Sequence, residues 1–161
     1  MTSSTENTVN DHVLVYCRPE VLYRFWLNLE NLPLFMGHLK EVKKKDELNS
    51  TWIAKAPLGA TVSWEATIME KIPNEKIVWQ SLPNSDVYNY GRVSFKYAII
   101  CEDPLPVYAT LLEVFILYKP PLGTLGEKIS SFFGENPKQK ISIDLKSLKE
   151  GIENNKYMNS G

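Results

Sequence analysis

The strongest constraint in this sequence is a long succession of strand-like segments between Leu39 and Tyr118. From Ala60 to Ile72 the even positions are mainly apolar, whereas most odd positions are polar. Such alternation is typical of strands with one buried face. Turn signals at Pro73-Asn74-Glu75 and Pro83-Asn84-Ser85 separate successive strands at short intervals. The pattern therefore predicts an antiparallel meander.

Helical patterns flank these strands. A first strand, Val9 to Cys17, precedes a helix that Pro19 opens, and a short helical turn follows at Leu34–Met36. After the strands, a helix is predicted over Leu122–Phe133, and Pro137 begins a longer one. The longer helix has an apolar stripe at helical spacing, formed by Ile141, Leu145, Leu148 and Ile152. This order predicts an α+β domain in which about seven curled strands enclose a mostly apolar cavity around the C-terminal helix.

Length and composition fit one domain. The 161 residues are 43% hydrophobic and carry a net charge of -1. So balanced a charge predicts no nucleic-acid binding. We expect a flexible N-terminus over 1–8, a single domain over 9–154 and a frayed C-terminus over 155–161. No export signal or run of about 20 apolar residues is present, so the expected location is cytoplasmic.

Motifs for catalysis, metals and cofactors are lacking. Cys17 and Cys101 show no CxxC spacing, so they are expected to be reduced and not to bind metal, with a disulfide as the lesser alternative. His12 has no acidic neighbour aimed at it by alternation, and His38 follows a glycine. No catalytic residue and no cofactor is assigned. Asn49-Ser50-Thr51, a glycosylation sequon, is predicted to be a turn.

Short segments along the chain resemble one protein superfamily. They are spread from Val9 to Glu153, and each is weak alone but specific in order and spacing. They comprise Val21–Trp26, Leu29–Pro33, Phe35-Met36 with Leu39 and Val42, Trp52, Pro57–Gly59, Trp64–Ala66, Ile77–Ser81, Gly91–Phe95, Tyr118 before Pro120-Pro121, and Asp144–Lys149. Together they resemble the helix-grip fold of the START-like (SRPBCC) superfamily, which is also the fold of birch allergens. Within it, the chain is similar to bacterial polyketide cyclase/dehydrase-type proteins, relatives of coenzyme-Q-binding proteins.

The resemblance implies a hydrophobic ligand in the cavity, such as a lipid, an isoprenoid or quinone, or a polyketide. The domain would bind this ligand and transport or sequester it. Inward parity and the resemblance together give the candidate ligand-binding residues: Met36, Trp52, Trp64, Trp79, Asn89, Phe95, Tyr97, Val114, Phe133 and Leu145. An aromatase/cyclase or dehydratase using the same cavity is the alternative, with Glu70, Asn89 and Tyr97 as the first polar groups to test.

One departure from the family pattern suggests a third function. The last strand is apolar on both faces, so Leu111, Phe115 and Leu117 are expected to form an outward stripe. Such a stripe favours a homodimer or a partner protein. Lys43–Lys45 is predicted to be a solvated hairpin tip, with peripheral membrane contact as the alternative.

Overall fold

The computed structural model describes residues 7–85, 87–119 and 137–157. Its elements are β1 (Asn7–Val15), α1 (Pro19–Leu27), the 3₁₀ helix η1 (Leu29–Leu34), β2 (Leu39–Lys44), β3 (Asn49–Lys55), the 3₁₀ turn η2 (Pro57–Gly59), β4 (Thr61–Ile72), β5 (Lys76–Ser81), β6 (Tyr88–Cys101), β7 (Val107–Lys119) and α3 (Pro137–Glu153). Two short helices therefore follow the first strand, and a long helix closes the chain.

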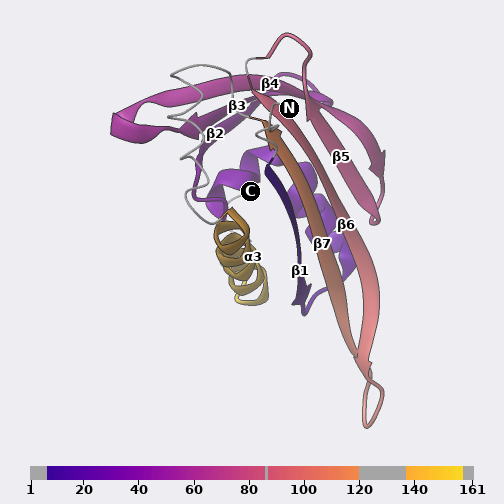
Figure 1. Cartoon of the computed structure of the whole chain (residues 1–161). Coiled ribbons are helices and arrows are strands. Elements are labelled where there is room, and N and C mark those ends of the chain that lie inside the picture. Colours follow the sequence, from indigo (N-terminus) through magenta and orange to yellow (C-terminus); the bar gives the residue numbers. More distant parts are fainter. Residues whose placement is uncertain (1–6, 86, 120–136, 158–161) are drawn as a thin grey trace, which may run out of the picture.

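The seven strands form one antiparallel sheet in the order β1-β7-β6-β5-β4-β3-β2. The sheet curls, and α3 packs against β1 on its concave side (Figure 1). The largely polar strand β2 lies at one edge of the sheet. The predicted α+β helix-grip architecture is confirmed.

The concave face of the sheet carries the core. Strand pairing places Trp52 opposite Trp64 and Phe95 opposite Leu112, and all four side chains are buried. From the other side, the α3 stripe contributes a further set of buried residues, namely Ile141, Leu145 and Leu148. The alternation in the sequence therefore identified the inner face correctly.

A bulge and a side-chain-stabilised turn depart from the prediction. The pairing of β4 with β5 shifts between Ile68 and Glu70, so the extra residue turns Glu70 to the outer face, opposite Val78. Glu70 is exposed there and pairs with Lys76 Nζ at 3.0 Å. The predicted turn at Asn49-Ser50-Thr51 is wrong, because these residues begin β3. The preceding turn is closed by Asp46, whose Oδ1 accepts hydrogen bonds from the backbone N–H groups of residues 48 and 49.

The outer face of β7 is apolar, as predicted, but it is partly covered. Leu111, Phe115 and Leu117 face outward and are half-buried. The Arg92 guanidinium lies 5.3 Å from the centre of the Phe115 ring, and the Tyr90 ring meets that ring edge-on. These two β6 side chains cover part of the Phe115 ring, the middle residue of the stripe.

His12 has an acidic neighbour after all, because β1–β7 pairing places it opposite Glu113. Alternation within one strand could not identify that neighbour, since it comes from a strand about a hundred residues away. The helix predicted over 122–133, including Phe133, lies outside the described residues. Among the residues that are described, no helix is long and apolar enough to cross a membrane.

Candidate functional site

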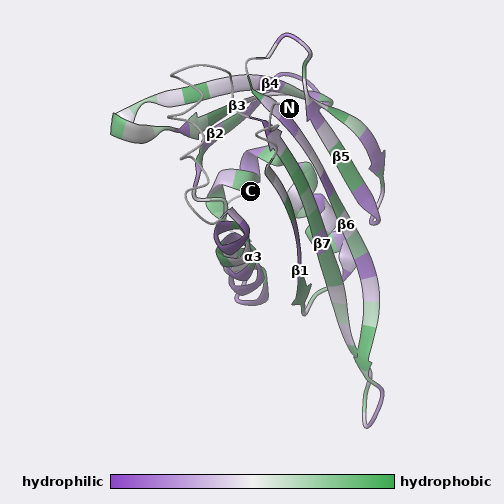
Figure 2. Ribbon diagram, in the orientation of Figure 1, coloured by the Kyte–Doolittle hydropathy of each residue, from purple (hydrophilic) through white to green (hydrophobic). Residues whose placement is uncertain are grey.

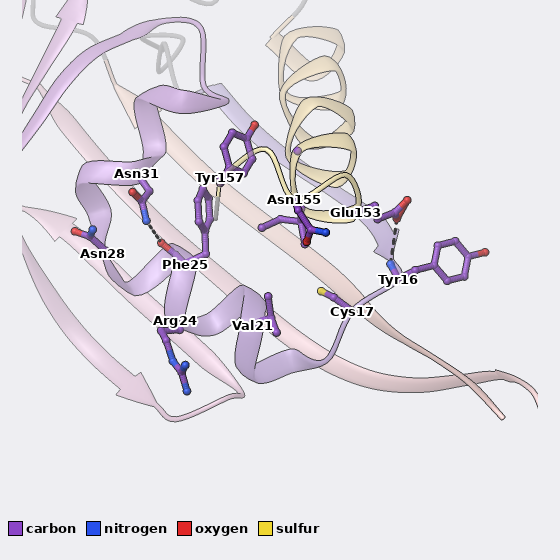
Figure 3. A pocket seen from close by; sticks show the side chains of 12 residues that line it. Tyr16, Cys17, Val21, Arg24, Phe25, Asn28, Asn31, Glu153, Asn155 and Tyr157 are labelled. Carbon is purple, nitrogen blue, oxygen red and sulfur yellow. Dashed lines mark hydrogen bonds between the residues drawn. The ribbon is translucent and has the colours of Figure 1, made fainter. Parts of the chain in front are cut away.

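Helix α1 forms one wall of a groove. Pro19 occupies its first turn, where a missing N–H costs nothing. The stripe that contains Leu22 and Trp26 is buried against the sheet. Val21 and Phe25 lie on the flank of that stripe and remain partly uncovered. This flank faces the C-terminal end of α3 (Figure 3).

The end of α3 forms the opposite wall. After Glu153 the chain turns through Asn155, which has a left-handed φ of 56°, a conformation that asparagine tolerates well. The turn brings the Tyr157 ring back over Gly151, where a Cβ would lie 2.0 Å from a ring carbon. The same ring stacks on Phe25 with centroids 5.0 Å apart. Gly151 is therefore required for close approach of Tyr157, and Tyr157 joins the two walls.

Between these walls lies a groove of about 720 Å³. Its exposed lining is mostly apolar, and the residues come from the β1–α1 link, α1, the segment after α1 and the end of α3. They are Tyr16, Cys17, Val21, Arg24, Phe25, Asn28, Asn31, Gly151, Ile152, Glu153, Asn155 and Tyr157 (Figure 3). Polar groups at the margin support the backbone: the Tyr16 N–H donates to Glu153 Oε2 at 3.1 Å, and Asn31 Nδ2 donates to the Phe25 carbonyl at 2.9 Å.

The Cys17 thiol in this groove is protected chemically. Burial raises its pKa to about 11, and the negative charges of Glu153 and Glu20 act in the same direction. Cys101, in contrast, is exposed on β6. Because the thiolate is the reactive form, we expect Cys17 to react with iodoacetamide at least about tenfold more slowly than Cys101 at mildly alkaline pH. Mass spectrometry of Cys17→Ser and Cys101→Ser proteins measures each rate separately. Equal rates would contradict the suppressed ionisation of the Cys17 thiol.

The three tryptophans that were predicted to bind the ligand form a buried aromatic wall next to the groove. Trp52 stacks on Trp79 with centroids 6.0 Å apart, and Trp64 lies 5.9 Å from Trp52. Trp26, from α1, lies 6.2 Å from Trp79 and 5.3 Å from Phe35. Phe35 in turn lies 6.1 Å from Phe25. Aromatic contacts are thus continuous from the groove to the deepest part of the concave face.

Most of the polar groups on this wall form hydrogen bonds with one another. Asn89 is buried, its Oδ1 accepts a hydrogen bond from Trp79 Nε1 at 2.9 Å, and its backbone N–H donates to Ser81 Oγ. Two indole groups differ: Trp26 Nε1 and Trp64 Nε1 are buried and have no hydrogen-bond partner within the described part of the chain. An unpaired buried donor costs about 1–3 kcal/mol, so an incoming acceptor oxygen would be stabilised at either position.

The other predicted ligand-binding residues fall into three cases. Those buried in the core with the tryptophans are Met36, Phe95, Val114 and Leu145. Tyr97 has the expected inward parity but is 53% exposed, because it lies beyond the part of the sheet that other elements cover. Phe133 falls outside the described residues.

A polar cluster that the sequence did not identify lies at the N-terminal half of α3. Asp144 Oδ1 accepts a hydrogen bond from the Gly37 N–H at 3.4 Å, and His38 Nδ1 lies 4.0 Å from Asp144 Oδ2. Burial raises the pKa of Asp144 to about 6, whereas burial and the nearby Lys140 and Lys55 lower the pKa of His38 to about 4. The cluster borders a cavity of about 290 Å³. Within the described ranges, no group of three or more His, Cys, Asp or Glu side chains could hold a metal ion.

Comparison with known proteins identifies the family. The sequence model of one family, described as "Polyketide cyclase / dehydrase and lipid transport", matches residues 16–146. The chain belongs to this family. No curated protein matches closely enough to add a more specific relative.

Solved structures of relatives have the same fold. A crystal structure from Deinococcus radiodurans is 32% identical to this cyclase/dehydrase-family chain, with a TM-score of 0.71 over 91% of this chain and 98% of that one. A START superfamily protein from Mycobacterium smegmatis is 17% identical, with a TM-score of 0.62 over 90% and 98% of the two chains. The Zhui aromatase/cyclase from Streptomyces is 10% identical, with a TM-score of 0.58 over 90% and 95%. The two more distant structures support the fold alone.

Proposed function

We propose that this domain binds a hydrophobic small molecule in the groove between α1 and the end of α3, and transports or sequesters it. The observation that carries the proposal is the groove itself. Its volume of about 720 Å³ lies within the roughly 300–1,000 Å³ range of small-molecule sites. Its walls include Val21, Phe25 and Ile152, so binding would be driven by burial of apolar surface. Membership of a family whose description includes lipid transport supports the same function.

The ligand we propose combines an apolar body with acceptor oxygens. Phe25 lines the groove and is linked through Phe35 to Trp26 of the aromatic wall. Two residues of this wall have unpaired indole donors, Trp26 Nε1 and Trp64 Nε1. A quinone or polyketide carbonyl would accept their hydrogen bonds, whereas a plain hydrocarbon would not. The free cysteines support action in a reducing compartment, such as the cytoplasm.

A cyclase or dehydratase is the second candidate function, and one observation favours it. Asp144 is a buried carboxyl whose pKa is raised to about 6, beside the imidazole of His38. A carboxyl with such a pKa can serve as a general acid or base near neutral pH. The residues that sequence parity suggested give less support, because Glu70 and Tyr97 are exposed and Asn89 is engaged with Trp79.

A carboxylate placed in the groove tests the binding function. Val21 is 44% exposed, so Val21→Glu is expected to fold normally and to put a charge beside the ligand. We expect affinity for anilinonaphthalene sulfonate and for a ubiquinone analogue to fall at least about tenfold, a loss of about 1.4 kcal/mol. Quenching of tryptophan fluorescence and the fluorescence of the bound dye measure the two affinities.

The matched control is Met69→Glu. Met69 is 59% exposed on β4 and lies outside the groove, so this change introduces the same charge elsewhere. Its affinities should equal those of the wild type. If Val21→Glu binds both probes as tightly as Met69→Glu, the groove is not the binding site.

A further inference from the structure

The hairpin of β6 and β7 extends beyond the rest of the sheet (Figure 1). Pairing of β7 with β1 ends at Thr110, opposite Val15, and pairing of β6 with β5 ends at Ser94, opposite Lys76. Beyond these points the two strands pair only with each other, as far as Cys101 and Val107. A two-stranded ribbon with no neighbour is marginally stable alone, so this part of the hairpin would gain stability from a covering surface.

Large apolar side chains occupy this ribbon. We name them the hairpin patch: Tyr97, Ile99, Ile100, Leu105, Val107 and Tyr108, each 40–73% exposed. Ile99 and Tyr108 are directly paired, and the Tyr97 and Tyr108 rings lie 5.5 Å apart. Figure 2 shows hydrophobic residues gathered toward the far end of β6. Tyr97, Ile99 and Tyr108 share one face of the ribbon, whereas Val107 points to the other face. Exposed apolar surface of this kind marks an interaction site.

The charges around the hairpin patch distinguish between classes of partner. Glu102 and Asp103 lie at the tip, and residues 97–109 include no lysine or arginine. An acidic tip is repelled by anionic lipid and is costly to insert into a bilayer. At the other end of the patch, Arg18 and Glu20 lie close enough to Tyr97 for their opposite charges to act on its hydroxyl. A surface that carries a positive and a negative charge at one end can pair with the same surface of a second copy.

We propose that the hairpin patch is the interface of a symmetric homodimer. In a two-fold arrangement each patch covers that of the other copy, and Arg18 of one copy faces an acidic residue, Glu20 or Glu102, of the other. About half of each side chain is exposed, and a side chain of this size has roughly 150–200 Å² of surface, so the patch without Val107 offers on the order of 400 Å² per copy. Two copies together contribute on the order of 800 Å², which fits a weak dimer.

Sedimentation velocity over a micromolar concentration series tests the proposal. The wild-type chain is expected to sediment as a dimer, and Ile99→Glu is expected to weaken dimerisation at least about tenfold by burying two unpaired carboxylates. Tyr108→Glu is a second, independent variant on the paired strand. Both side chains are exposed, so both variants should keep the wild-type circular dichroism spectrum. Met69→Glu, outside the patch, is the control and should remain dimeric.

Three outcomes would overturn the proposal. The first is a wild-type chain that stays monomeric throughout the series. The second is a dimer that Leu117→Glu dissociates while Ile99→Glu and Tyr108→Glu do not, which would assign the interface to the outer stripe of β7. The third is a monomer that floats with phosphatidylcholine vesicles in a patch-dependent manner, which would make the hairpin a membrane contact. Ligand binding at the groove is measured separately, so none of these outcomes decides whether the proposed binding function is correct.

Discussion

Replacing Gly91 by alanine is expected to lower the free energy of unfolding by about 3 kcal/mol. Gly91 lies on the inner face of β6, directly opposite Trp79 on β5. A Cβ at this position would lie 2.0 Å from the Trp79 ring. That ring cannot move aside easily, because it is 1% exposed, stacks on Trp52 and donates a hydrogen bond to Asn89. The added methyl group would therefore disturb the whole aromatic wall.

Urea denaturation followed by tryptophan fluorescence measures this loss, and two other glycines provide controls. Around Gly37 nothing lies within 4 Å of an added Cβ, so Gly37→Ala should change stability little. At Gly151 the clash is with the outer ring atoms of Tyr157, which can swing away, so Gly151→Ala should be milder than Gly91→Ala. Equal stability of Gly91→Ala and Gly37→Ala would mean that Trp79 is free to shift.

The inner wall could be predicted because strand periodicity is a local signal. Alternation along β4 and β6 assigns Trp64 and Phe95 to the buried face without knowledge of any other element. The same signal misplaces Glu70, since a single extra residue at the bulge after Ile68 reverses the parity of the rest of the strand. Parity also does not show where the covering layer ends. Tyr97 faces inward but extends beyond that layer.

The groove could not be predicted because it depends on contacts distant in sequence. Val21 and Phe25 belong to an apolar helical stripe and cannot be distinguished by pattern from core residues. By propensity Gly151 is only a weak point of the last helix, whereas its role is to admit the Tyr157 ring, which then stacks on a residue of α1. No periodicity predicts that return of the chain. An aromatic residue a few positions after a glycine at a helix end is the one signal that could have indicated it.

The polar cluster was missed for a related reason. Asp144 forms part of the segment Asp144–Lys149, which resembles the family, but its partners are Gly37 and His38, about a hundred residues earlier. Burial of a carboxyl raises its pKa, and burial depends on the packing around the group and not on its neighbours in sequence.

Asp144→Asn is expected to stabilise the protein in a pH-dependent manner. Burial raises the pKa of this carboxyl from 3.8 to about 6 in the folded state. The folded protein therefore prefers the protonated form, and ionisation lowers stability as the pH rises through this interval. Asparagine cannot ionise, so the substitution removes this loss of stability. The two proteins should be about equally stable near pH 4 and should differ by at most about 3 kcal/mol at neutral pH.

Asp46→Asn is the control of opposite sign. Hydrogen bonds from the Asn49 side chain and from the backbone at Asn49 and Leu48 hold the pKa of Asp46 below its usual value. Its ionised form is thus the stabilising one, and its replacement should reduce stability at neutral pH. The same pair of variants tests the enzymatic alternative, because a cyclisation that requires Asp144 as acid would be lost only in Asp144→Asn.

Urea titrations at several pH values between about 4 and 8 decide the sign for each variant. His38 contributes a separate dependence, since its pKa is lowered to about 4 and stability is lost as the pH falls from its ordinary value of 6.5 toward that point. Because the His38 imidazole lies 4.0 Å from Asp144 Oδ2, the two titrations are coupled, and the sign for Asp144→Asn is taken at or above about pH 7, where His38 is mainly neutral in the folded and the unfolded protein. If Asp144→Asn instead destabilises the protein at neutral pH, the carboxylate is held ionised by a favourable pair with protonated His38. The cluster would then be a structural ion pair, and Asp144 would be a poor proton donor.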